Sequence, residues 1–258
     1  MNTNVVPPQL AAVAAAPASA GAVGPSPGQD PLEREPIVNA VVAVEALLRQ
    51  PRRVMYQLRQ PGSGRLIGSM LFVGLMCSLI YGVVVGSFSM GTQLWAAPVK
   101  IAGGLLVCAI ICLPSLYIFT CLSGSRAGLG EICGLLAGLV LLMTLLLLGF
   151  APVAWLFSQS TNSVVWMGAL HLLFWFIATV FGLRFLQTGF SHSQPRSAAG
   201  LNTWTLIFIL VMLQMTTALR PLVGKSSTFF PAGKEFFVTH WEDSLKAEQT
   251  GPHRTSTD

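Results

Sequence analysis

Long apolar stretches separated by short polar connections dominate the chain from residue 66 onward. A bilayer core about 30 Å thick is crossed by about 20 helical residues, because each residue advances the helix by about 1.5 Å. Five stretches reach or approach this length: 66–88, 99–122, 132–157, 164–186 and 204–219. The last reaches a full span only if Leu201 and Leu222 at its flanks are counted. The pattern predicts an all-α, polytopic transmembrane bundle of about five spans.

The distribution of basic residues predicts the orientation, because cytoplasmic loops of membrane proteins are enriched in Lys and Arg. With the N-terminus inside, the cytoplasmic side holds eight arginines: Arg49, Arg52, Arg53, Arg59, Arg65, Arg126, Arg184 and Arg196. The opposite short loops hold only Lys100. An odd number of spans then places residues 220–258 outside. If 204–219 does not span, this tail is cytoplasmic instead.

Four tryptophans fall at the predicted membrane boundaries, where indole rings are enriched. Trp95, Trp155 and Trp166 lie at the outer boundary and Trp204 at the inner one. We expect all four to contact the lipid interface.

Two short amphipathic segments within residues 37–65 precede the first span. The first ends at Pro51 and has an apolar face of Ile37, Val38, Val41, Val44 and Leu48. The second carries Val54, Met55 and Leu58 among Arg52, Arg53 and Arg59. Such segments lie in the headgroup plane, with apolar residues in lipid and arginines against anionic headgroups. We interpret this region, with Arg49 and Arg65 at its edges, as an interfacial anchor; a helix that docks a partner is the alternative.

The two ends of the chain differ in composition. Residues 1–36 are rich in Ala, Pro and Gly and have too little large apolar surface to fold, so we expect disorder. The tail interleaves charged residues with aromatic ones, namely Phe229, Phe230, Phe236, Phe237 and Trp241. An exposed aromatic cluster of this kind needs a covering surface. We expect a helix resting on the outer leaflet, and a contact with another subunit is the alternative.

Small residues repeat every four positions in two of the predicted spans. The first span carries the row Gly74, Ser78, Gly82 and Gly86, and the third carries Gly130, Gly134 and Gly138. Helices associate in lipid by close backbone approach at such rows. We predict that both rows pack against helices, either of the same chain or of a second copy.

Chemical groups inside the predicted spans are few. Charged residues make up 10% of the chain, and the pattern places none deep inside a span. His171 is the one titratable side chain well inside, while Gln214, Thr216 and Thr217 lie near the outer end of the fifth span. These four form a candidate intramembrane polar site. A hydrogen-bonded packing role for His171 is the simpler interpretation.

The sequence predicts no enzyme, no cofactor, no metal site and no nucleic-acid partner. Cys108 and Cys112 share a helical face, but the other histidines lie in loops or in the tail, so a metal would lack ligands. Phosphate-binding glycine loops, HExxH pairs and nucleophile elbows are all missing from the sequence. The basic residues flank a membrane span instead of forming an aromatic-interleaved basic patch.

The layout of spans, basic flank and short loops resembles that of bacterial Yip-like five-span membrane proteins over about residues 43–219. No diagnostic motif accompanies this layout, and the acidic Tyr-Gly-Pro signature of the eukaryotic Yip proteins is absent. The resemblance implies a non-enzymatic membrane adaptor. We therefore expect a subunit or adaptor of a membrane complex that contacts lipid and either other membrane subunits or its own copies.

A permease-like component for a neutral or apolar solute, with the His171 site lining its path, is the alternative function. Richness in Ala, Gly, Arg and Pro favours a bacterial inner membrane as the location.

Overall fold

The protein is described by a computed structural model that covers residues 27–89, 93–125, 127–160, 164–191 and 199–218. The described elements are eight helices: α1 (Pro31–Arg34), α2 (Ala40–Arg49), α3 (Pro51–Leu58), α4 (Gly64–Ser89), α5 (Gln93–Leu122), α6 (Leu129–Ser160), α7 (Val164–Ser191) and α8 (Ala199–Ala218). Helices α4 to α7 are each long and apolar enough to cross a membrane, and α8 is a shorter apolar helix. The predicted helical membrane bundle of about five spans is confirmed. The aromatic segment of the tail lies outside the described residues.

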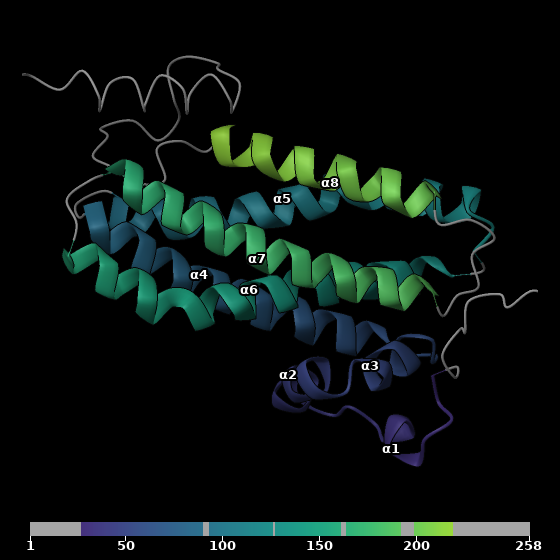
Figure 1. The fold of residues 1–258 in the computed structure, drawn as a ribbon. Coiled ribbons are helices and arrows are strands. Elements are labelled where there is room, and N and C mark those ends of the chain that lie inside the picture. The colour runs from purple at the N-terminus through teal and green to yellow at the C-terminus, as the bar shows by residue number, and fades with distance from the viewer. Residues whose placement is uncertain (1–26, 90–92, 126, 161–163, 192–198, 219–258) are drawn as a thin grey trace, which may run out of the picture.

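Helix α6 lies at the centre of the bundle. It packs against α4 and α7, while α5 lies between α4 and α8 (Figure 1). In the most apolar 18-residue stretch of each helix, 61% of the residues of α6 are buried, compared with 33–39% of those of α4, α5 and α7. Helix α8 rests on α5 and meets α7 at few positions. We call the end of the bundle with Arg59, Arg65 and Arg184 the basic end, and the opposite end the far end.

Helix α5 begins at Gln93, six residues before the predicted start of the second span. Pro98 lies inside this helix and packs closely against the backbone of Gly82 on α4. The missing side chain of Gly82 leaves room for Pro98 at this contact. As a result Lys100 lies two turns inside α5 with its side chain 2% exposed, and the prediction of Lys100 in a loop is wrong.

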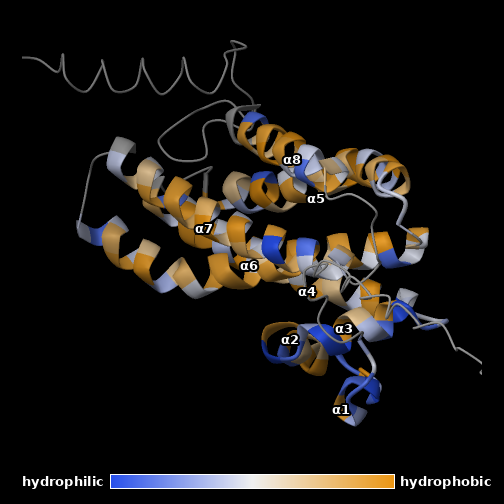
Figure 2. Ribbon diagram, turned by 45° about the vertical axis from the view of Figure 1, so that its right-hand side comes forward, coloured by the Kyte–Doolittle hydropathy of each residue, from blue (hydrophilic) through white to orange (hydrophobic). Residues whose placement is uncertain are grey.

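Polar residues gather on α1 to α3, whereas α4 to α8 are mostly apolar (Figure 2). Pro51 separates α2 from α3 as predicted, because it occupies the first position of α3. Helix α1 lies within the segment expected to be disordered. Its N-cap Asp30 accepts a hydrogen bond from the Leu32 amide, which satisfies one free amide of the short helix.

Candidate functional site

Helices α1 to α3 and their connections, residues 27–59, form a unit that we call the platform. It packs on the bundle through α2 and α3, and the contacts of α3 are the more specific. The side chain of Leu58 fills the space left open by Gly134 on α6. One residue further, Arg59 Nε donates to Glu131 Oε1 over 2.8 Å, at the beginning of α6. An apolar and an ionic contact thus join the same two helices.

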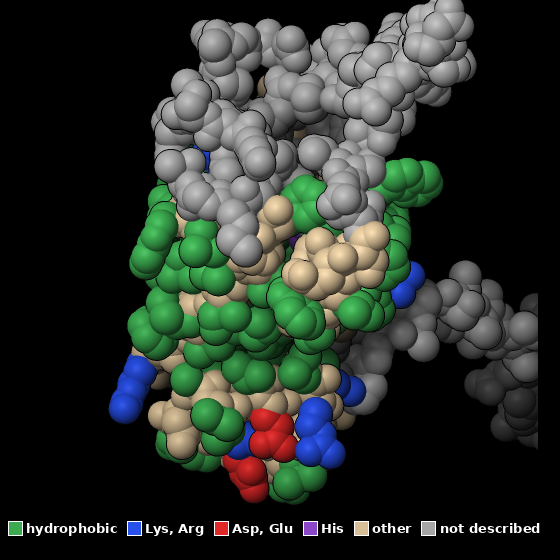
Figure 3. Space-filling view, turned by 90° about the vertical axis from the view of Figure 1, so that its left-hand side faces the viewer, with side chains coloured by type: hydrophobic (Ala, Val, Ile, Leu, Met, Phe, Trp, Pro, Cys, Tyr) green, Lys and Arg blue, Asp and Glu red, His purple; other side chains and the backbone are tan. Residues whose placement is uncertain are grey.

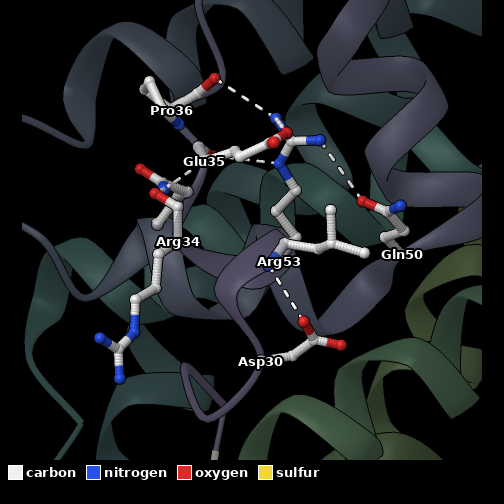
Figure 4. A network of polar contacts seen from close by, with 8 residues as sticks. Asp30, Arg34, Glu35, Pro36, Gln50 and Arg53 are labelled. Carbon is white, nitrogen blue, oxygen red and sulfur yellow. Dashed lines mark hydrogen bonds and ion pairs between the residues drawn. The ribbon is translucent and has the colours of Figure 1, made fainter.

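Ion pairs also hold the platform together internally. Arg52 lies 2.9 Å from Glu33, and Arg53 lies 3.4 Å from Glu35. Arg53 is the hub of the network in Figure 4, because it also donates to the carbonyl oxygens of Glu35 and Pro36 and to the Gln50 side chain. These contacts tie the segment around α1 to α3.

The platform corrects part of the predicted lipid interface. Val54, Met55 and Leu58 are at most 2% exposed, so the prediction that they face lipid is wrong. Arg52, Arg53 and Arg59 form ion pairs within the chain. The physical reason is that the fold brings glutamates close to these arginines. Glu33 and Glu35 belong to the segment expected to be disordered, and Glu131 is distant in the sequence.

Arg49 and Arg65 keep positions suited to lipid headgroups. The Arg49 side chain is 76% exposed, and its ion-pair partner Glu45 on the same helix is also exposed. Arg65 is exposed at the start of α4. Their contact with lipid stays a prediction.

A buried polar pair lies in the half of the bundle nearer the far end. The hydroxyl of Tyr81 on α4 is 2.8 Å from Nδ1 of His171 on α7. Tyr81 is fully buried and His171 is 6% exposed. The two rings meet edge to face, with centroids 5.8 Å apart. The bond joins two helices that the sequence separates by 90 residues.

The histidine of this pair lies beside an aromatic ring, because the rings of His171 and Phe174 meet edge to face with centroids 6.4 Å apart. Phe150 of α6 stacks on Phe174 of α7 with centroids 4.6 Å apart. Nε2 of His171 is buried and has no hydrogen-bond partner among the described residues. A buried nitrogen of this kind costs about 1–3 kcal/mol unless a partner satisfies it.

Of the other predicted members of this site, Gln214 is not brought to His171. Gln214 is exposed on α8, while His171 is buried against α4. The side chains of Thr216 and Thr217 lie outside the described residues. Sequence reasoning missed Tyr81, because a tyrosine within an apolar run resembles a packing residue. A polar hydroxyl one position before Gly82 in the small-residue row was the available signal.

Trp204 does not face lipid. It is fully buried between α8 and α5, and its indole Nε1 donates to Cys112 O (3.1 Å) and Ser115 Oγ (3.2 Å). The prediction of Trp204 at the lipid interface is wrong. One turn earlier, Gly200 brings the α8 backbone close to Phe119 of α5, so the side chain at 204 meets α5.

The three other tryptophans of the predicted interface have exposed side chains. Trp95, Trp155 and Trp166 are 80%, 53% and 71% exposed, respectively. Lipid contact of these residues stays a prediction.

Two glycines of the small-residue row of α4 contact other helices of the same chain. A Cβ on Gly74 would lie 3.5 Å from Leu141 Cα of α6, and a Cβ on Gly82 would overlap the Pro98 backbone of α5. Ser78 and Gly86 are buried. The packing role of the row is tested by the substitutions discussed below.

The row on α6 is divided among different neighbours. Gly134 faces Leu58 of α3, and Gly138 faces the Phe185 ring of α7. A Cβ on Gly130 would meet nothing within 4 Å, so this position is open. Its predicted packing role has no support from the contacts of this chain.

No protein-family model, curated protein or solved structure matches this chain. The resemblance in layout to Yip-like proteins therefore stays a prediction. Among the described residues, no group of three or more His, Cys, Asp or Glu side chains could hold a metal ion.

Proposed function

We propose that this chain is a non-enzymatic subunit or adaptor of a membrane complex and that it acts through protein contacts made by the platform. The observation that carries the proposal is the attachment of the platform to α6 through Leu58 and the Arg59–Glu131 ion pair. A segment anchored by lipid alone could move independently of the spans. Attachment to the central helix holds the platform at a fixed place, as an adaptor requires.

The polar side of the platform offers a surface for a partner. Acidic and basic side chains gather at the bottom of Figure 3, where the platform lies, and the surface above them is largely apolar. Glu35 is 58% exposed there, and Arg34 and Gln50 are exposed as well. Mixed charges of this kind provide orientation and specificity in protein contacts.

The interior of the bundle supports a structural protein better than a permease. Buried hydroxyl groups bond to carbonyl oxygens of their own helices, as Ser78 does to Leu75, Thr120 to Leu116 and Thr144 to Leu141. A path for a neutral solute that forms hydrogen bonds needs such groups to line its wall. The separation of Gln214 from His171 points in the same direction.

The test is co-purification of a tagged full-length chain after mild extraction from its own membrane, followed by mass spectrometry. We expect a partner protein in fixed ratio with the wild type. Glu131→Arg places a like charge opposite Arg59 and should reduce recovery of that partner at least fivefold. The charge exchange Arg59→Glu with Glu131→Arg keeps the net charge and should restore it.

Two outcomes would contradict the proposal. One is a wild-type chain that purifies alone. The other is undiminished partner recovery with Glu131→Arg while faster tryptic cleavage at Arg52 and Arg53 shows that the platform has been released.

A further inference from the structure

We propose that the outward face of α2 lies in the lipid of the leaflet at the basic end, as a wedge between the bundle and the headgroups. Acyl chains cover its aliphatic side chains, and Arg49 at its C-terminal end binds lipid phosphate. The sequence assigned lipid contact to both short helices. In the structure the apolar side chains of α3 are buried against the bundle, so α2 is the short helix whose apolar side chains are free to contact lipid.

Helix α2 is apolar on two opposite sides. Ala43, Ala46 and Leu47 are at most 3% exposed and pack toward the bundle. On the other side, Val41 is 76% exposed and Leu48 is 54% exposed. A helix lying between protein and water needs only one apolar face. The second apolar face requires a second apolar environment.

The position of α2 identifies that environment as lipid. The helix lies along the flank of α4, not beyond its end, and also contacts α6 (Figure 1). The half of α4 nearer the basic end exposes Leu71, Phe72 and Leu75, which must face acyl chains in a membrane-spanning helix. Because α2 packs against α4, we infer that its outward face continues this lipid-facing surface.

The charge at the end of α2 fits the headgroup region. Arg49 is the last residue of the helix, and its guanidinium is exposed although it pairs with Glu45. Guanidinium groups bind phosphate oxygens through paired hydrogen bonds. The adjoining Gln50 and Pro51 turn the chain into α3, so the arginine lies at the edge of the apolar face and not within it.

A protein partner fits this face less well than lipid. Binding hot spots on proteins are enriched in Trp, Tyr and Arg and lie at the centre of a polar rim. The outward face of α2 carries Val41 and Leu48 with the charged Glu45 between them, which pairs with Arg49, and no aromatic residue. Its features are those of an interfacial helix.

Photo-crosslinking in native membranes tests the wedge directly. Benzoylphenylalanine is introduced at Val41 or Leu48 of the full-length chain, and at Glu35 as a matched exposed position on the polar side. After irradiation, intact-mass measurement should show phospholipid adducts at Val41 and Leu48 in at least fivefold higher yield than at Glu35. Equal lipid yields would overturn the proposal, as would adducts with another protein or with residues 1–26.

The headgroup contact has its own readout. With the crosslinker at Leu48, Arg49→Gln should at least halve the share of anionic phospholipid among the lipid adducts. Arg34→Gln removes a matched exposed charge from α1 and should leave this share unchanged. An unchanged share with Arg49→Gln would overturn the role of Arg49. Lipid crosslinking does not depend on recovery of a partner protein, so its outcome tests the lipid contact of α2 separately from the proposed adaptor function.

Discussion

Helices α6 and α8 are both apolar, yet the bundle holds them in different ways. Helix α6 is enclosed by α4 and α7, whereas α8 rests along one side of α5. Lipid tails are as apolar as the side chains of either helix, so water exclusion does not distinguish the two positions. The difference is that α6 packs closely against helices on two sides, whereas α8 packs closely on one side only.

The contacts of α6 with α7 use small residues on both helices. Gly182 of α7 meets Leu139 and Met143, and Gly189 meets Leu135. In the opposite direction, Gly138 of α6 admits the Phe185 ring. These reciprocal contacts hold the two backbones close over several turns.

The contact of α8 with α5 is a single stripe. Gly200, Trp204, Phe208 and Met212 recur every four residues along the side of α8 that is buried. Trp204 supplies the polar part through its bonds to Cys112 and Ser115, and it stacks on Phe208 with centroids 5.1 Å apart. We therefore expect the core to unfold as a unit and α8 to detach locally.

The largest expected effect comes from breaking the core. Gly82→Ala places a methyl group into the Pro98 backbone, which cannot move aside as a flexible side chain can. We expect the free energy of unfolding to fall by about 3 kcal/mol. Unfolding by SDS, followed by circular dichroism, measures this. Gly130→Ala adds the same group in open space and should be neutral or slightly stabilising; an equal loss would contradict the packing explanation.

Disrupting the contact between α8 and α5 should destabilise α8 locally. Trp204→Ala removes the largest buried side chain at α8 together with its two hydrogen bonds, at a cost of about 2–3 kcal/mol to the attachment of α8. Hydrogen exchange followed by mass spectrometry should show faster exchange of the α8 amides and unchanged protection of α6. Equal acceleration in both helices would show that edge and core are one cooperative unit.

The buried polar pair sharpens the comparison within the core. Within the part of the chain that the structure describes, Tyr81→Phe leaves both nitrogens of His171 without a partner, and it should lower the free energy of unfolding by about 1–2 kcal/mol. Adding His171→Phe removes the polar group altogether and should recover most of the loss. SDS unfolding of the single and double variants measures both. A double variant less stable than Tyr81→Phe would mean that His171 makes a contribution beyond this bond.

The smallest effect is expected at the platform. Arg59 and Glu131 are partly exposed, so their coupling should be about 0.5–1 kcal/mol. A double-mutant cycle with Arg59→Gln and Glu131→Gln measures it through the rate of tryptic cleavage at Arg52 and Arg53. The coupling should shrink at high salt, because salt screens exposed charges. A coupling unaffected by salt would indicate that the contact is not mainly ionic.

The sequence was sufficient to predict which segments form helices, but not which side of each helix packs against protein. Each of the five predicted spans corresponds to a described helix, and His171 was identified as a titratable group inside one of them. The bond to Tyr81 was not foreseen, because it joins residues 90 positions apart. The second span was predicted to begin at residue 99, whereas α5 begins at Gln93 and continues through Pro98, which packs closely against Gly82 of α4.

The sequence by itself determined that this chain crosses a membrane as a bundle of about five helices, because the length of an apolar run must match the thickness of the bilayer. The tertiary structure alone decided which apolar faces meet protein. Hydropathy reports transfer out of water, and it has the same value for the inside of a protein as for lipid. Val54 and Val41 therefore look alike in the sequence, although one packs on the bundle and the other is exposed. The pairing of Arg59 with Glu131 depends on that same folding, because 72 residues separate the two charges along the chain.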